Sequence, residues 1–160
     1  MQENKEFNQI ISEIIENDKI NQLKKMSHHG INRFDHSLSV AYFSYKLAKY
    51  LKLDYKQAAR GGMLHDFFET PEGHGVKVCF KSIVEHPDIA LNNAKSIFSL
   101  REKEEDIIVT HMFPFGKHIP KCGESWVVNC VDKFLTLCEI TYVASYRFNF
   151  AKAVVLERLR

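Results

Sequence analysis

Apolar side chains recur every three or four residues along most of the chain, and this spacing limits the possible folds more than any other feature. Residues 5–24 place Phe, Ile and Leu side chains on one broad stripe, and the segment from Phe34 to Leu51 is apolar on nearly all sides. Both patterns match the period of an α-helix. No alternating apolar and polar run of useful length is present. The sequence therefore predicts an all-α fold, a single compact bundle of six or seven helices.

Capping residues mark the next boundaries. Asp54 is a typical N-cap residue and predicts a third helix over residues 55–65. The Pro and Gly content of residues 69–75 predicts a loop. Pro87 suits the first turn of a fourth helix, because its missing N–H would be unpaired there in any case.

The last third of the chain carries similar signals. Ser99 followed by Glu102 has the form of a capping box and predicts a fifth helix through about His111. Residues 112–125 contain two prolines and two glycines, so a second loop is expected. From Trp126 onward the chain is predicted to be helical again toward its C-terminus.

Length and charge suggest one domain without an obvious charged partner. With 160 residues, 45% of them hydrophobic, the chain suits one domain over residues 1–160. We divide it into an N-terminal helix (1–26), a core with the candidate site (27–140) and a C-terminal helix (141–160). The net charge of +2 demands neither nucleic acid nor an anionic membrane. No apolar run reaches the ~18 residues of a spanning helix, so a cytoplasmic protein is expected.

Four cysteines stand outside any CxxC pair. The sequence places them at Cys79, Cys122, Cys130 and Cys138. This spacing disfavours a zinc ribbon or a disulfide framework. Buried free thiols are the prediction, since free cysteine is commonly a core residue.

Histidine and aspartate gather where the predicted helices begin and end. One expects a helix start at His36 and His86, a helix end at His65, Asp66 and His111, and a helix interior at Asp132. Facing helices of an all-α domain can bring such side chains together around a metal. Imidazole and carboxylate ligands without thiolate suit Fe, Mn, Zn, Co or Ni.

The adjacent pair His65–Asp66 follows the apolar residues Met63 and Leu64 and precedes Phe67. Neighbouring side chains inside a helix diverge by about 100°, but a helix end can turn both inward. A bound cation would stabilise the burial of these polar groups, and one carboxylate can bridge two ions. The alternative is a polar core network satisfied by protein atoms alone.

The segment "RFDHSLSVAYFSYKLAKYLKLDYKQAARGGMLHDFFE" resembles the opening of the HD superfamily of metal-dependent phosphohydrolases. The superfamily signature, H…HD…D, corresponds here to His36, His65–Asp66 and Asp132. The resemblance covers residues 29–139 and implies an HD-type helical bundle in which these four side chains bind metal.

Dinuclear members of the superfamily have two further histidines between the HD pair and the last aspartate. His86 and His111 lie at suitable positions, so the resemblance implies them as ligands of a second ion. Met112 stands where one cyclic-dinucleotide phosphodiesterase branch has a second, tandem histidine, which disfavours that branch. The dinucleoside-tetraphosphate hydrolase branch is nearer in size and histidine pattern.

The catalytic candidates implied are Asp66 and Glu69. Many members have Lys three residues after the HD aspartate, whereas some nucleotidase-like members have a Glu there that donates a proton to the leaving group. A solvated loop carboxylate is the alternative for Glu69. Candidate contacts to substrate phosphate are His29, Arg33, Lys117 and Lys133. The lysines could equally be ordinary solvent-facing side chains.

The resemblance implies hydrolysis of a phosphoester or phosphoanhydride of a small, nucleotide-like substrate by metal-activated water. One or two divalent transition-metal ions are expected, Fe or Mn first, with Zn, Co, Ni or Mg as alternatives. No specific nucleic acid and no membrane are expected as partners. A di-iron oxygenase and a non-enzymatic sensing module with a relic site are the rival functions. The aromatic-rich segment 142–150 is expected in the core, with a homodimer surface as the alternative.

Overall fold

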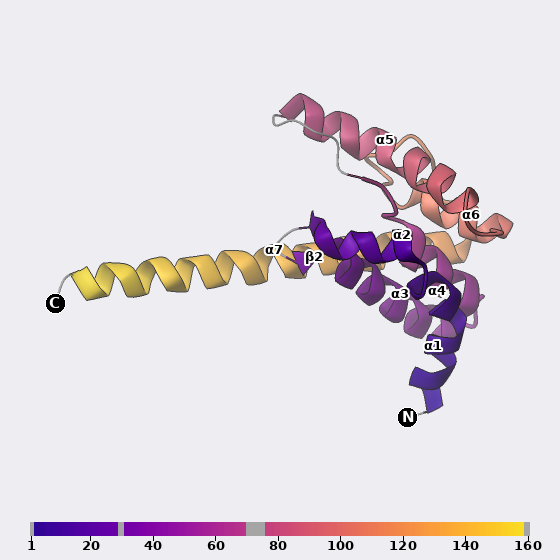
Figure 1. Ribbon diagram of the computed structural model, residues 1–160, viewed down its shortest axis with the longest axis horizontal. Helices are drawn as coiled ribbons and strands as arrows, with labels where there is room; N and C mark the ends of the chain where they lie inside the picture. Colours follow the sequence, from indigo (N-terminus) through magenta and orange to yellow (C-terminus); the bar gives the residue numbers. More distant parts are fainter. Residues whose placement is uncertain (1, 29–30, 70–75, 159–160) are drawn as a thin grey trace.

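The computed structural model has seven α-helices in its described residues, as the helical periodicity of the sequence predicted (Figure 1). The structure describes residues 2–28, 31–69 and 76–158. Within these ranges the α-helices are α1 (Gln2–Ile15), α2 (Asp18–Asn21), α3 (Arg33–Tyr50), α4 (Tyr55–Leu64), α5 (Val76–Lys95), α6 (Glu102–Thr110) and α7 (Gly123–Arg158). The all-α prediction is confirmed, and no described helix is long and apolar enough to cross a bilayer.

The N-terminal segment is not the continuous helix that its periodicity predicted. The side chain of Asn17 accepts a hydrogen bond from the Lys19 N–H and caps α2, while Asn21 donates to the Ile15 carbonyl at the end of α1. Asparagine side chains compete in this way with helical backbone hydrogen bonds. A 3₁₀ turn, η1 (Gln22–Lys25), follows α2.

A short antiparallel pair, β1 (Ser27–His28) and β2 (Ile31–Asn32), connects η1 to α3. Two-residue strands are too short to produce an alternating pattern, so sequence periodicity could not predict them. The start of α3 is fixed by Asn32, whose side chain accepts from the Asp35 N–H.

Helix α3 has one exposed apolar face, although its sequence suggested an encircled central helix. Val40, Ala41 and Tyr45 are fully buried, whereas Phe43 is 51% exposed and Tyr50 82% exposed. The neighbouring helices cover only part of the circumference, which the composition of one helix cannot reveal.

Helix α4 lies at the centre because small residues let its neighbours approach closely. Asp54 caps it as predicted, accepting from the Gln57 N–H. A Cβ on Gly61 would stand 2.7 Å from the Ile107 side chain of α6, and one on Gly62 would stand 3.0 Å from the Ala41 backbone of α3. Glycine is required for this packing, which brings the end of α4 into the interior.

Helix α5 begins earlier than predicted. It contains Pro87 in its interior, so His86 lies within the helix and not at its start. A proline costs a helical hydrogen bond wherever it occurs after the first turn; here Pro87 is buried, and packing outweighs the local preference.

Helix α6 begins two residues later than the capping-box prediction. The carboxylate of Glu104, not Glu102, accepts from a preceding N–H, that of Arg101. Ser99 lies outside the helix. The sequence has the Ser-x-x-Glu form of a capping box at residues 99–102, but Glu104 supplies the capping carboxylate.

Helix α7 packs on α3 with its first half and then extends away from the other helices (Figure 1). Cys130 and Cys138 are exposed on it and Cys122 is half-buried, so the prediction of buried thiols is wrong for the described cysteines. Tyr142 is 73% exposed, which contradicts a core position for the start of segment 142–150. The side chains of residues 146–150 lie outside the description.

Candidate metal centre

Six histidine and aspartate side chains meet in the interior, each less than a tenth exposed. They are His36 of α3, His65 and Asp66 after α4, His86 of α5, His111 after α6, and Asp132 of α7. We call this set the central cluster. The structure therefore brings together all six side chains proposed as metal ligands, from five helices far apart in sequence.

One half of the central cluster surrounds the carboxylate of Asp132. His36 Nε2 lies 3.1 Å from Asp132 Oδ1, and His65 Nε2 lies 3.6 Å from the same oxygen. The donor atoms of these three residues all lie within 4.8 Å of one another. Their spacing is that of a site able to bind one cation.

The other half surrounds Asp66. His86 Nε2 and His111 Nε2 are 2.8 Å apart, and they lie 3.4 and 3.5 Å from Asp66 Oδ1. The second oxygen, Asp66 Oδ2, lies 3.9 Å from His65 Nε2. Asp66 thus faces both halves of the central cluster, one oxygen toward each.

Two of the imidazoles are oriented by the helix ends that carry them. His65 and His111 each follow the last residue of a helix, and their Nδ1 atoms lie 2.7 Å from the carbonyl oxygens of Gly62 and Ile108. A carbonyl can only accept, so Nδ1 carries a proton, and in the neutral ring Nε2 presents a lone pair to the interior. The buried Nε2 of His65 has no hydrogen-bond partner in the described part of the chain.

A further carboxylate orients His36. Glu139 lies two helical turns after Asp132 on α7, and its oxygens lie 2.8 and 3.0 Å from His36 Nδ1. Such a carboxylate–histidine pair fixes the ring and raises its basicity toward a metal. Burial opposes it, but the hydrogen bonds to Asp132 and Glu139 raise the pKa of His36 to about 10. Sequence reasoning missed this role, though the seven-residue spacing from Asp132 was available as a signal.

The surrounding imidazoles favour the ionised form of the Asp66 and Asp132 carboxylates. Although burial opposes it, neighbouring His65, His111 and His86 hold the pKa of Asp66 well below its usual value. The pKa of Asp132 is lowered as well, against burial, by the hydrogen bond to His36 and by the nearby imidazole of His65. Burial lowers the pKa of His111, which favours its neutral form. Ionised carboxylates and neutral imidazoles are the forms that bind metal ions.

The predicted substrate contacts are dispersed. Arg33 is buried with its Nε 3.9 Å from Asp66 Oδ2, and Lys133 donates to the His111 carbonyl at 2.7 Å. Lys117 is exposed and lies 3.5 Å from Asp88, and Glu69 is exposed just after the Asp66 turn. His29 lies outside the described residues. The geometry groups only Arg33 and Lys133 with the central cluster.

Two further residues that the sequence analysis did not single out hold the cluster in place. The Phe68 ring stacks on His86 with centroids 4.5 Å apart, and the Arg33 guanidinium lies 4.0 Å from the centroid of the same ring. Asn129 of α7 donates to the carbonyls of His111 and Phe113 at 2.7 and 2.9 Å. Neither belongs to a sequence motif, because both act through tertiary contacts.

Comparison with known proteins agrees with this geometry. The model of the HD domain family matches residues 33–136, a span that includes the whole central cluster. The chain belongs to the HD domain family. The resemblance drawn from the sequence is thereby confirmed, and the superfamily is one of metal-dependent phosphohydrolases.

Among curated proteins, the chain is similar to Ribonuclease Y of Mycoplasma capricolum subsp. capricolum and of Mycoplasma mycoides subsp. mycoides SC. Each is 30% identical over 147 residues, covering 86% of this HD-domain chain. The alignment covers 28% of each relative, so the chain spans little more than a quarter of their length. No solved structure matches significantly.

Proposed function

We propose that this HD-domain protein is a metal-dependent phosphohydrolase that cleaves a phosphoester or phosphoanhydride bond of a small, nucleotide-like substrate with a metal-activated water. One observation carries the proposal: six buried side chains with metal-ligand atoms face one another. The Nε2 atoms of His86 and His111 lie 2.8 Å apart, and the buried Nε2 of His65 has no hydrogen-bond partner in the described residues. At most one proton fits between the first two nitrogens, and the neutral His65 ring adds a lone pair that has no donor in the described residues. A cation satisfies them.

The donor set suits one or two divalent transition-metal ions. His36, His65 and Asp132 would hold one ion, His86 and His111 a second, and Asp66 would contact both. Nitrogen and carboxylate donors without thiolate fit Fe or Mn, with Zn, Co, Ni or Mg as alternatives. When bound, such ions lower the pKa of a coordinated water and polarise a phosphoryl oxygen.

Protein side chains would orient the substrate. Arg33 lies beside Asp66 with its charge buried, where a guanidinium can pair with a phosphoryl oxygen. Glu69 would give a proton to the leaving group from the exposed end of the Asp66 turn. His29, Lys117 and Lys133 remain proposed phosphate contacts, Lys133 from its position on the His111 carbonyl.

A second candidate substrate is RNA. The similarity to proteins named Ribonuclease Y supports cleavage of an RNA phosphodiester, whereas the near-neutral charge of the chain led us to expect no specific nucleic acid. Nucleic-acid binding generally depends on a surplus of Lys and Arg, so we rank small nucleotides first. We further propose a cytoplasmic enzyme without a membrane partner, and leave a homodimer open.

The test combines elemental analysis of anaerobically purified protein with a metal-by-substrate screen. The panel contains dinucleoside polyphosphates, nucleoside monophosphates, cyclic nucleotides and a short single-stranded RNA, each assayed with Fe²⁺, Mn²⁺, Zn²⁺, Co²⁺, Ni²⁺ and Mg²⁺. We expect phosphate or nucleotide release by the native protein and none by Asp66→Asn. Metal-replete protein that leaves every substrate intact would refute hydrolysis, and oxygen uptake with a diol or phosphonate would favour the di-iron oxygenase. Function that survives Asp66→Asn would favour the sensing module.

A further inference from the structure

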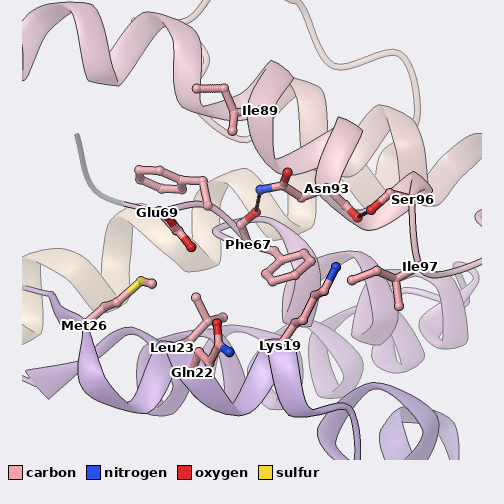
Figure 2. A pocket seen from close by; sticks show the side chains of 11 residues that line it. Lys19, Gln22, Leu23, Met26, Phe67, Glu69, Ile89, Asn93, Ser96 and Ile97 are labelled. Atoms are coloured by element: carbon pink, nitrogen blue, oxygen red, sulfur yellow. Dashed lines mark hydrogen bonds between the residues drawn. The ribbon is translucent and has the colours of Figure 1, made fainter. Parts of the chain in front are cut away.

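A cavity of about 470 Å³ lies against the turn that follows Asp66 (Figure 2). It lies between α2 with η1 on one side and α5 on the other, and the turn after Asp66 forms its inner wall. Its lining includes Lys19, Gln22, Leu23, Met26, Phe67, Phe68, Glu69 and Asn93. A single water occupies about 30 Å³ of liquid, so this space is no ordinary packing defect. Its volume falls in the range of small-molecule sites.

The inner wall of the cavity is held by three contacts, one of which is to His86 of the central cluster. The Phe67 carbonyl accepts from Asn93 of α5 at 3.0 Å, and the Phe68 carbonyl accepts from Arg33 of α3. The Phe68 ring stacks on His86. Since Phe67 and Phe68 directly follow Asp66, a ligand against this wall is held at a fixed position relative to the central cluster.

The cavity combines apolar walls with unused polar groups. Phe67, Leu23 and Met26 present apolar surface, and the side chains of Gln22, Lys19 and Glu69 point toward the interior (Figure 2). Within the described residues, the Lys19 ammonium and the Gln22 amide make no hydrogen bond or ion pair. An amide, an ammonium and a carboxylate at the edge of an aromatic-lined space can together meet donors and acceptors on one flat ligand.

We propose that this cavity binds the nucleobase of the substrate whose phosphoryl group is cleaved at the central cluster. The proposal rests on the proposed function for the reaction and adds the site that recognises the rest of the molecule. A nucleobase is flat and apolar on its faces and polar along its edge, and aromatic side chains with edge hydrogen bonds are the usual way proteins bind unpaired bases. Gln22 and Lys19 would contact the base edge, and Phe67 a base face.

The distance between the two sites agrees with one ligand spanning both. His86 and Asn93 are seven residues apart on α5 and so lie on one face about 10 Å apart along the helix. His86 contacts Asp66, while Asn93 lines the cavity. A sugar and its phosphate bridge a separation of this order.

The first experiment measures base binding without chemistry. Adenosine, guanosine, cytidine and uridine are titrated into metal-free protein while the side-chain amide signals of Gln22 and Asn93 are followed by NMR, with ribose 5-phosphate as the control lacking a base. Saturable shifts with at least one nucleoside and none with ribose 5-phosphate are expected. Absence of shifts up to the solubility limit of all four nucleosides would overturn the proposal.

A space-filling variant supplies a matched comparison. Gln22 is exposed at the cavity and Lys25 is exposed on the same 3₁₀ turn outside it, so Gln22→Trp should fold and fill the cavity while Lys25→Trp leaves it open. Nucleoside affinity should fall by about tenfold or more in Gln22→Trp and stay unchanged in Lys25→Trp. Equal effects of both variants would show that the base binds elsewhere.

The second experiment separates this proposal from the proposed function. Gln22→Trp should raise KM for the active nucleotide substrate about tenfold while kcat/KM for bis(4-nitrophenyl) phosphate, which has no base, stays unchanged. If both activities fall together, the cavity serves the metal centre and not the base. If the native protein hydrolyses nothing yet binds nucleosides at Gln22, the proposed reaction fails while the base site stands.

Discussion

Two polar clusters in this protein join helices in different ways, one at the half-exposed edge of the bundle and one in its interior. The first, which we call the Glu6 network, joins α1 to α3 and α4 through Glu6, Tyr45, Lys49 and Tyr55. One carboxylate receives donors from all three partners, with distances of 2.7 Å to Tyr45, 2.6 Å to Lys49 and 2.9 Å to Tyr55. Each donor has an acceptor, so the network is complete with protein atoms alone.

The central cluster lacks this balance. Imidazole nitrogens face one another and the buried Nε2 of His65 has no partner in the described residues. An unpaired buried polar atom costs roughly 1–3 kcal/mol, so an unpaired nitrogen among converging imidazoles and carboxylates indicates a role other than stability. The comparison shows that protein atoms alone satisfy the hydrogen bonds of a structural network. A ligand site, in contrast, directs lone pairs toward one point without supplying donors for all of them.

The sharpest test removes one charge from each cluster with an isosteric change. Asp66→Asn takes away the carboxylate that faces both halves of the central cluster, so we expect loss of bound metal and a fall in activity beyond the roughly 100-fold upper range of supporting residues. Glu6→Gln should leave both unchanged. Metal content by elemental analysis and kcat/KM measure the outcome, and metal retained by folded Asp66→Asn would contradict the assignment.

A smaller effect is expected from the carboxylate that orients His36. Glu139→Gln keeps the size of the side chain but loses the charge that accepts from His36 Nδ1, and metal affinity or activity should fall about 10–100-fold. Glu102→Gln, an exposed change on α6, is the control. Equal metal affinity in the native protein and Glu139→Gln would show that the ring is held by packing alone.

Metal addition should stabilise the fold only through the central cluster. At a free metal concentration of 100 times Kd, binding adds about 2.7 kcal/mol to the free energy of unfolding, or roughly 5–10 °C in Tm for a chain of this size. Chelation should reverse the shift. The same titration of Asp66→Asn should give no shift, and a Tm that ignores metal in the native protein would argue against the site.

The smallest expected effect concerns the Glu6 network: the free energy of unfolding should decrease at acidic pH. Hydrogen bonds from Lys49, Tyr45 and Tyr55 lower the pKa of Glu6 from 4.5 to about 2. Because the folded-state pKa is lowered, the stabilisation is fully present above pH 4.5 and is lost as the pH falls toward 2. Denaturant unfolding should show a steeper loss over this window in the native protein than in Glu6→Gln. The same pH dependence of the unfolding free energy in both proteins would contradict this prediction.

The local part of the fold was predictable because its signals are short-range. Asp54 caps α4 and the α3 periodicity gave its span, since both depend on neighbours within one helical turn. The starts of α5 and α6 were wrong because packing kept Pro87 inside a helix and Glu104 supplied the cap expected from another residue.

The order His36, His65–Asp66, Asp132 identified the family from the sequence by itself, because ligand type and spacing are written along the chain. Only the tertiary structure decided that Glu139 orients His36, that Phe68 stacks on His86, and that a cavity opens beside Asp66. These contacts join residues brought together by the packing of α3, α5 and α7. Their energies depend on distances that no one-dimensional pattern contains.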